Sequence, residues 1–317
     1  MLGIRSDFMR KITMNPQNSK SMKEIFELFI LSQTAKGLSD TTLKNYGYHM
    51  RNISRYMNTE KPLSEVAKSD IDLMVVAMRK AGLAHNSIAT YVRMLKTFFN
   101  WSNEEGFSNI TISSMKEKET VKDTYTDEEL KLLLKRPDKN CEFAEFRSWV
   151  IINFLMNSGC RAATVRHIQN RDVDLAALQV IFRHNKNGKI QTIPLCSVMG
   201  NILKDYMRIR GGNPADYLFC DIYGGFLTED ALRHAVARYN KSRGVRSTSL
   251  HKFRHTFARK YLVDCGGNAF TLQRLMGHST LAMTKHYCRI FDGDIAKNYD
   301  LHSPLAQLQK PKDRITK

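Results

Sequence analysis

The first hundred residues repeat apolar positions with the period of an α-helix. The clearest stripe has members three or four residues apart: Leu43, Tyr46, Met50, Ile53 and Met57. Residues at that spacing lie on one face of a helix, and Ser39 or Asp40 can cap its start. Similar stripes begin at Ile25, Ile71 and Ile88. The pattern predicts a small bundle of helices.

Candidate caps and breaks separate these helices. Pro62 interrupts the chain after the second stripe. Ser69 is the expected cap of the third helix, and Asn86 or Ser87 that of the fourth. The bundle is therefore expected to fill residues 19–111.

The rest of the chain mixes helical stripes with one alternating segment. Thr126 and Glu129 can form a capping box at the start of a helix. The apolar run from Trp149 to Met156 predicts a buried helix, which Gly159 can end in the left-handed conformation. Further helices are expected through Val165 and Ile168 and from Leu232 to Lys241.

A β-hairpin is expected over residues 178–195. Three apolar residues there alternate with polar ones: Leu178, Val180 and Phe182. That period of two is typical of a strand with one buried face. Asn187-Gly188 is a strong turn signal, and Ile193-Pro194 closes the second strand. The fold class predicted is mainly α with a small β-sheet.

A polar junction divides the chain. Residues 112–124 are polar and charged without an apolar face, which is typical of a linker. The expected division is a flexible leader, an N-terminal domain, a linker, a C-terminal domain and a tail, at residues 1–18, 19–115, 116–124, 125–295 and 296–317.

The charge of the chain indicates a polyanionic partner. Lys and Arg number 49 against 31 Asp and Glu, a formal net charge of +18. Nucleic acid is the first candidate and an anionic membrane surface is the alternative. No apolar run approaches the roughly 20 residues of a transmembrane helix, and the N-terminus lacks a secretory signal pattern. We therefore expect a cytoplasmic protein associated with the nucleoid.

The sequence offers no pattern for a metal or a nucleotide cofactor. Its six cysteines contain no Cys-x-x-Cys pair, so they are expected to be reduced thiols. His251 and His255 have the spacing of a zinc-binding pair, but no Glu lies between them. No phosphate-binding G-x-x-x-x-G-K-[ST] loop occurs. We expect neither a cofactor nor a metal.

Four polar residues near the C-terminus stand at suggestive distances. His251 and Arg254 are three residues apart, His278 follows in Leu-Met-Gly-His-Ser, and Tyr287 comes nine residues later. On a helix the first two share a face, and the arginine fork suits phosphate oxygens. A lone His-x-x-Arg is commonly a solvated helix face, and a lone tyrosine is commonly packing. The combination favours a site in which the tyrosine attacks a bound phosphate.

This constellation resembles the tyrosine recombinase (phage integrase) family, in which Leu-Gly-His-Ser precedes the tyrosine; Met276 here replaces the leucine. The resemblance implies that Arg161, after Gly159, is the first catalytic arginine. It also implies that Lys186 on the hairpin is the catalytic lysine, with Lys189 as the fallback. Thr164 stands where the family commonly has Glu, so Arg161 lacks that orienting carboxylate.

The family's chemistry assigns a role to each residue. Tyr287 would form a 3′-phosphotyrosyl bond with DNA, Arg161 and Arg254 would hold the phosphate, and Lys186 would protonate the leaving 5′-oxygen. His251 and His278 would add hydrogen bonds and help to remove the tyrosine proton. His255 and His286 are taken as structural, and Tyr299 as the backup nucleophile.

Segments 37–57 and 91–107 resemble the family's helical, SAM-like core-binding domain. Five basic residues lie off its apolar stripes and are candidate DNA contacts: Lys44, Arg51, Arg55, Arg93 and Lys96. An ordinary solvated face is the alternative. The resemblance implies double-stranded DNA as partner, a dimer on each site, a homotetramer on paired sites and an optional DNA-bending accessory factor. The tail would pack on a neighbouring subunit or fold back on its own domain.

Several functions fit this reading. The first is a recombinase that integrates or excises a mobile element. A Xer-type resolvase of chromosome dimers is the alternative within the family. A type IB topoisomerase shares much of the chemistry, and a relative that binds DNA without cleaving it is the alternative outside catalysis.

Overall fold

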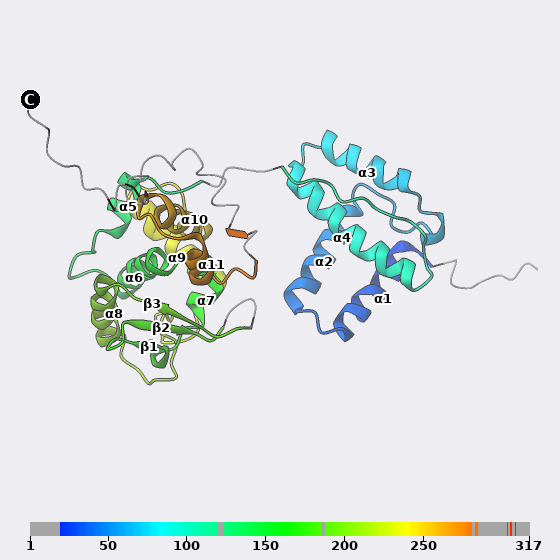
Figure 1. Ribbon diagram of the computed structural model, residues 1–317. Coiled ribbons are helices and arrows are strands. Elements are labelled where there is room, and N and C mark those ends of the chain that lie inside the picture. Colours follow the sequence, from blue (N-terminus) through cyan, green and yellow to red (C-terminus); the bar gives the residue numbers. More distant parts are fainter. Residues whose placement is uncertain are drawn as a thin grey trace, which may run out of the picture. The chain divides into compact units, whose positions relative to one another are not determined.

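The computed structural model describes residues 20–118, 123–184 and 188–280, together with 283, 284, 303, 305 and 308. The chain separates after Thr120 into two compact units (Figure 1). Within the described residues no helix combines the length and the apolar character needed to cross a membrane.

Four helices form the N-terminal unit: α1 (Met22–Ala35), α2 (Asp40–Ile53), α3 (Lys68–Lys80) and α4 (His85–Glu104). A short 3-10 helix, η2 (Leu63–Glu65), precedes α3. Helix α4 is central, because α1, α2 and α3 all pack against it. Phe29 and Phe98, both fully buried, meet edge to face with ring centroids 5.6 Å apart. The predicted helical bundle is confirmed.

The helix starts follow local hydrogen bonds. Ser39 caps α2 as predicted, and its hydroxyl accepts from the backbone N–H of Thr42. The prediction that Ser69 caps α3 is wrong. That helix starts after Ala67, whose N–H donates to the Asp70 carboxylate at 2.8 Å. Helix α4 begins after Ala84, ahead of the predicted caps Asn86 and Ser87.

The segment that leaves α4 stays on the N-terminal unit. Ile112 is 5% exposed and belongs to the apolar core. Asn86 exchanges two hydrogen bonds with the backbone of Lys118, each of 3.0 Å. The prediction that residues 112–124 have no buried side is therefore wrong at Ile112. Its apolar contact could not be seen in a run of mostly polar residues.

The C-terminal unit is built around α6 (Phe143–Ser158). Residues on successive positions of this helix, such as Val150, Ile151 and Ile152, are all fully buried, so α6 is covered on every side. The helices α5, α8, α9 and α10 pack against it, at Asp127–Leu134, Ser197–Arg210, Glu229–Ser242 and Leu250–Arg259. The remaining helical segments are α7 (Ala162–Arg166), η3 (Asn170–Asp172), η4 (Lys260–Asp264) and α11 (Ala269–Met276).

A three-stranded antiparallel sheet with the order β1-β2-β3 completes the unit. Its strands are β1 (Val173–Asp174), β2 (Gln179–Phe182) and β3 (Gln191–Pro194). Val180 pairs with Ile193, and Val180 and Phe182 are both buried, so the predicted hairpin and its apolar face are confirmed. The two-residue strand β1 was not predicted because it is too short to show a period. In the predicted turn, Asn187 lies outside the described residues and Gly188 has φ +65°.

Candidate active site

The turn after α6 brings Arg161 to helix α10. Gly159 ends α6 with φ +58°, as predicted, and Arg161 is the N-cap residue of α7. A Cβ atom on Gly159 would lie 2.1 Å from Cδ1 of Phe257 on α10. Only a glycine leaves room for α10 to approach this closely, so the backbone of the turn lies directly against the helix that carries His251 and Arg254.

Arg254 is fixed by the carboxyl ends of two helices. It is 6% exposed. Its Nη1 donates to the carbonyl oxygen of Gly159 at 2.7 Å, and its Nη2 to that of Met276 at 2.9 Å. These carbonyls belong to the ends of α6 and α11, where the helix dipole places partial negative charge. Backbone dipoles thus stabilise this buried cation.

His278 is the third partner of Arg254. Nη2 of Arg254 lies 2.8 Å from Nε2 of His278. Because a guanidinium can only donate, Nε2 must accept, and the proton lies on Nδ1. Nδ1 then donates to Oγ1 of Thr284, 2.8 Å away. Burial, with the nearby charges of Arg254 and Arg161, lowers the pKa of His278 to about 4, so the imidazole is neutral.

The structure brings Arg161, Arg254 and His278 together. A Cβ atom on Gly277 would lie 4.0 Å from a terminal nitrogen of Arg161, which places that arginine beside the turn leading into His278. Among the described residues, Arg161 forms no ion pair with a carboxylate. The site is therefore a cationic cluster beside a neutral imidazole.

His251 lies one turn before Arg254 on α10, as its spacing predicted, but it is exposed where Arg254 is buried. Lys189, the fallback lysine, lines a groove of about 550 Å³ together with His278, Arg274 and Thr192. The remaining candidates, Lys186 and Tyr287 with the alternatives His286 and Tyr299, lie outside the described residues.

One contact in the site has no signal in the sequence. Nε2 of Gln191 on β3 donates to the carbonyl oxygens of Arg274 and Leu275, at 3.1 Å for the latter. Gln191 therefore ties the hairpin to the last turn of α11, which leads into His278. The residues it joins are more than eighty positions apart in the chain, so no local pattern marks the contact.

The five candidate DNA contacts divide into two groups. Lys44, Arg51 and Arg55 are exposed on or just after α2. On α4, Arg93 forms an ion pair with Glu117, and Nζ of Lys96 donates to Oγ of Ser114 at 3.1 Å. The two α4 residues are thus held by the segment that follows their own helix, whereas the first three point into solvent.

Comparisons with known proteins agree over both units. Residues 123–293 match the phage integrase family, and residues 28–114 match the phage integrase N-terminal SAM-like domain. The tyrosine recombinase XerC of Bacillus licheniformis is 24% identical over 305 residues, covering 92% of this chain and 99% of that protein.

Two solved structures share the fold. The Tn1549 transposon integrase in complex with circular intermediate DNA has a TM-score of 0.70 and 21% identity, over 85% of this chain and 95% of that one. A lambda integrase tetramer bound to a Holliday junction has a TM-score of 0.70 and 17% identity, over 88% and 81%. These structures agree with the matched domains in fold, and the matched domains show that the chain belongs to the phage integrase family of tyrosine recombinases, the site-specific recombinases that cleave and rejoin DNA strands.

Proposed function

We propose that this recombinase cleaves DNA through Tyr287. Its phenolic oxygen attacks a backbone phosphorus, the bond from phosphorus to the 5′-oxygen breaks, and a 3′-phosphotyrosyl bond forms. Lys186 gives a proton to the leaving 5′-oxygen, and His251 assists the loss of the tyrosine proton, whose reference pKa is about 10. An incoming 5′-hydroxyl reverses these steps and joins a new strand, so no ATP is needed.

The cluster of Arg161, Arg254 and His278 is the observation that carries the proposal. Attack places extra negative charge on the phosphate oxygens, and preorganised donors stabilise that charge. Arg254 is held in a fixed orientation, because carbonyl oxygens at the ends of α6 and α11 accept its hydrogen bonds. Because His278 is neutral, it does not repel the Arg254 guanidinium. Its Nε2 instead accepts a hydrogen bond that keeps Arg254 oriented.

The partner we propose is double-stranded DNA, bound by a dimer at each site and by a homotetramer when two sites are paired. The net charge of +18 and the exposed cations of α2 support DNA binding. Leu305 and Leu308 of the tail are 64% and 84% exposed, which supports packing of residues 296–317 on a neighbouring subunit. We also propose that a DNA-bending accessory factor assists the recombinase, and that the recombinase acts at the nucleoid in the cytoplasm.

The biological role we propose is integration or excision of a mobile element. One observation favours the alternative of a Xer-type chromosome-dimer resolvase: the chain aligns with nearly the full length of XerC. The two roles differ in their DNA sites, one at the ends of an element and the other in the chromosome.

Trapping of covalent adducts tests both parts of this proposal. The chain and a Tyr287→Phe variant are expressed in cells that carry the native DNA, and DNA bound covalently to protein is recovered after rapid denaturation. We expect adducts with the parent and none with the variant, and sequencing of the trapped DNA identifies the role. Equal recovery from both would move the nucleophile to Tyr299 or elsewhere. No adduct from either would favour a protein that only binds DNA.

A further inference from the structure

Helix α10 begins without the features that usually hold a helix start. The side chain of its N-cap residue Ser249 makes no capping hydrogen bond, and no acidic residue lies in its first turn. His251 and Lys252 lie there instead. A cation in the first turn opposes the helix dipole, and burying it adds a desolvation cost. Lys252 is nevertheless only 8% exposed, so other groups must offset both costs.

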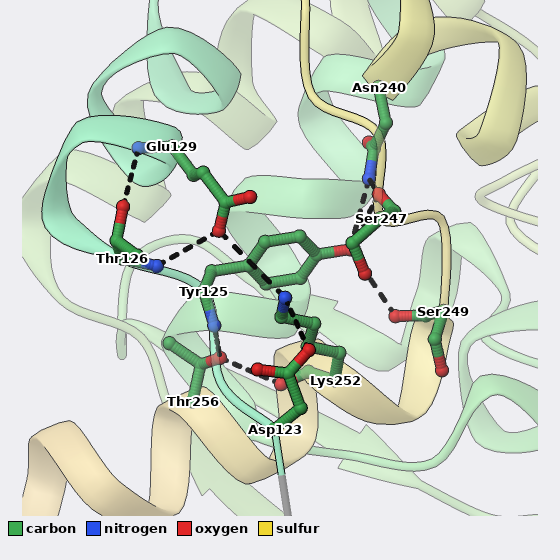
Figure 2. A network of polar contacts seen from close by, with 9 residues as sticks. All are labelled: Asp123, Tyr125, Thr126, Glu129, Asn240, Ser247, Ser249, Lys252 and Thr256. Carbon is green, nitrogen blue, oxygen red and sulfur yellow. Dashed lines mark hydrogen bonds and ion pairs between the residues drawn. The ribbon is translucent and has the colours of Figure 1, made fainter.

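Residues 123–129 supply those groups (Figure 2). Nζ of Lys252 lies 2.8 Å from a carboxylate oxygen of Asp123 and 3.9 Å from one of Glu129. The same nitrogen lies 4.7 Å from the ring centroid of Tyr125. Two carboxylates and an aromatic face therefore surround the ammonium group, and all three come from the segment that enters the C-terminal unit.

Hydrogen bonds of the backbone strengthen this attachment. The N–H of Tyr125 donates to Oγ1 of Thr256 at 2.9 Å, and the Thr256 hydroxyl donates to the carbonyl oxygen of Lys252 at 2.7 Å. The entering segment is thus bonded to α10 one turn beyond Lys252, on a stretch that also contains Arg254.

The Tyr125 hydroxyl holds the chain just before α10. It accepts from Nδ2 of Asn240 at 3.0 Å and lies 3.3 and 3.4 Å from the carbonyl oxygens of Ser247 and Ser249. Burial raises the pKa of Tyr125 to about 12, which keeps it a neutral donor. The tyrosine is 2% exposed, and its ring packs on that of Phe253 with centroids 4.4 Å apart.

From these contacts we propose that Lys252 and Tyr125 are positioning residues for recombination, which lock the first turns of α10 against residues 123–129 and so set His251 and Arg254 in place. The proposal rests on the function proposed above. Its mechanical basis is that Arg254 lies between Lys252 and Thr256, and that its bonds to Gly159 and Met276 tolerate little movement of the helix.

The test compares single variants of the full chain. Lys252→Met removes the charge but keeps an aliphatic side chain against the Tyr125 ring, and Tyr125→Phe removes only the hydroxyl. Lys260→Met is the matched control, because Lys260 is also paired with the entering segment, through Asp127, but lies beyond α10. Lys252→Arg is the rescue variant, since arginine can still pair with both carboxylates.

The substrate is a duplex carrying the DNA sequence trapped with the parent chain, nicked so that cleavage is irreversible. Displacement by about 1 Å can cost about a hundredfold in rate. We therefore expect Lys252→Met to slow adduct formation at saturating DNA by about tenfold or more, with a smaller loss for Tyr125→Phe. The DNA concentration for half-saturation and the melting temperature should stay close to those of the parent. Lys260→Met and Lys252→Arg should react at nearly the parent rate.

Two results would overturn the proposal. Either Lys252→Met and Tyr125→Phe react at the parent rate, or their losses of rate merely follow a loss of folded protein or of DNA affinity. A parent chain that forms no adduct would mean instead that the proposed function fails, and the proposal would fall with it.

Discussion

At the scale of single residues, the site depends on which atoms are protonated. Arg254 can only donate, so His278 must present an unprotonated Nε2 and a protonated Nδ1. In this arrangement His278 orients Arg254, and Nε2 of His278 is engaged by the Arg254 guanidinium. We therefore propose the exposed His251 as the histidine that assists loss of the tyrosine proton.

The lowered pKa of His278 predicts a specific sensitivity to acid. In the unfolded chain a histidine has a pKa near 6.5, against about 4 in the folded protein. Between these values the unfolded state binds more protons, so the stability contributed by neutral His278 is complete above pH 6.5 and falls as the pH drops towards 4. The difference of about 2.5 units corresponds to about 3 kcal/mol.

Urea denaturation at pH 7 and pH 4.5 checks this prediction. The parent should lose about 2 to 3 kcal/mol more than His278→Gln between the two pH values, because the variant has no imidazole to protonate. Equal losses in both proteins would show that His278 is not the group responsible.

At the scale of elements, the end of α6 packs closely against α10. Gly159 is confined both by its backbone conformation and by the Phe257 ring. Its carbonyl oxygen also receives Arg254. Gly159 thus ends α6, leaves room for α10 and accepts a hydrogen bond that orients Arg254.

Gly159→Ala should therefore destabilise the protein by about 2 to 5 kcal/mol, combining about 1 to 2 for left-handed backbone with about 1 to 3 for overpacking. Gly244→Ala is the matched control, because Gly244 has φ +78° and open space around it. The control should show only the backbone cost. The measurement is the free energy of unfolding in urea, and similar losses at the two positions would contradict the close packing of α10 on the turn.

At the scale of the whole molecule, we propose that the net charge of +18 serves DNA binding. Lys44, Arg51 and Arg55 are exposed on or near α2, and no ion pair engages them among the residues that the structure describes. They are better placed to meet phosphates than Arg93 and Lys96, which the 114–117 segment already contacts.

Replacing those three cations by Gln should flatten the salt dependence of DNA binding. If each contacts one phosphate, the slope of log affinity against log salt falls in magnitude by about 2.7, since each contact contributes about 0.9. Fluorescence anisotropy with a random-sequence duplex measures the slope. The same change at Lys68, Arg79 and Lys80 on or at the end of α3 is the control. A larger effect from that control would assign the DNA-binding face to α3.

The sequence determined by itself whatever depends on neighbours along the chain. The period of apolar residues predicted the helical bundle and the β2–β3 hairpin, Gly159 predicted the end of α6, and the spacing of His251, Arg254, His278 and Tyr287 indicated the family. Local hydrogen bonds that the pattern does not show can still make such a prediction wrong. At the start of α3 the N–H of Ala67 donates to the Asp70 carboxylate, and the N-cap residue is Ala67, not the predicted Ser69.

Only the tertiary structure decided which partners these residues have. Arg254 bonds to carbonyls 95 and 22 residues away, and Tyr125 to Thr256 across 131 residues. Backbone carbonyls are the same at every position, so no side-chain pattern shows which of them will receive a guanidinium. Burial likewise sets the charge of His278 and holds Lys252 among carboxylates, because desolvation depends on everything packed around a group and not on its neighbours in sequence.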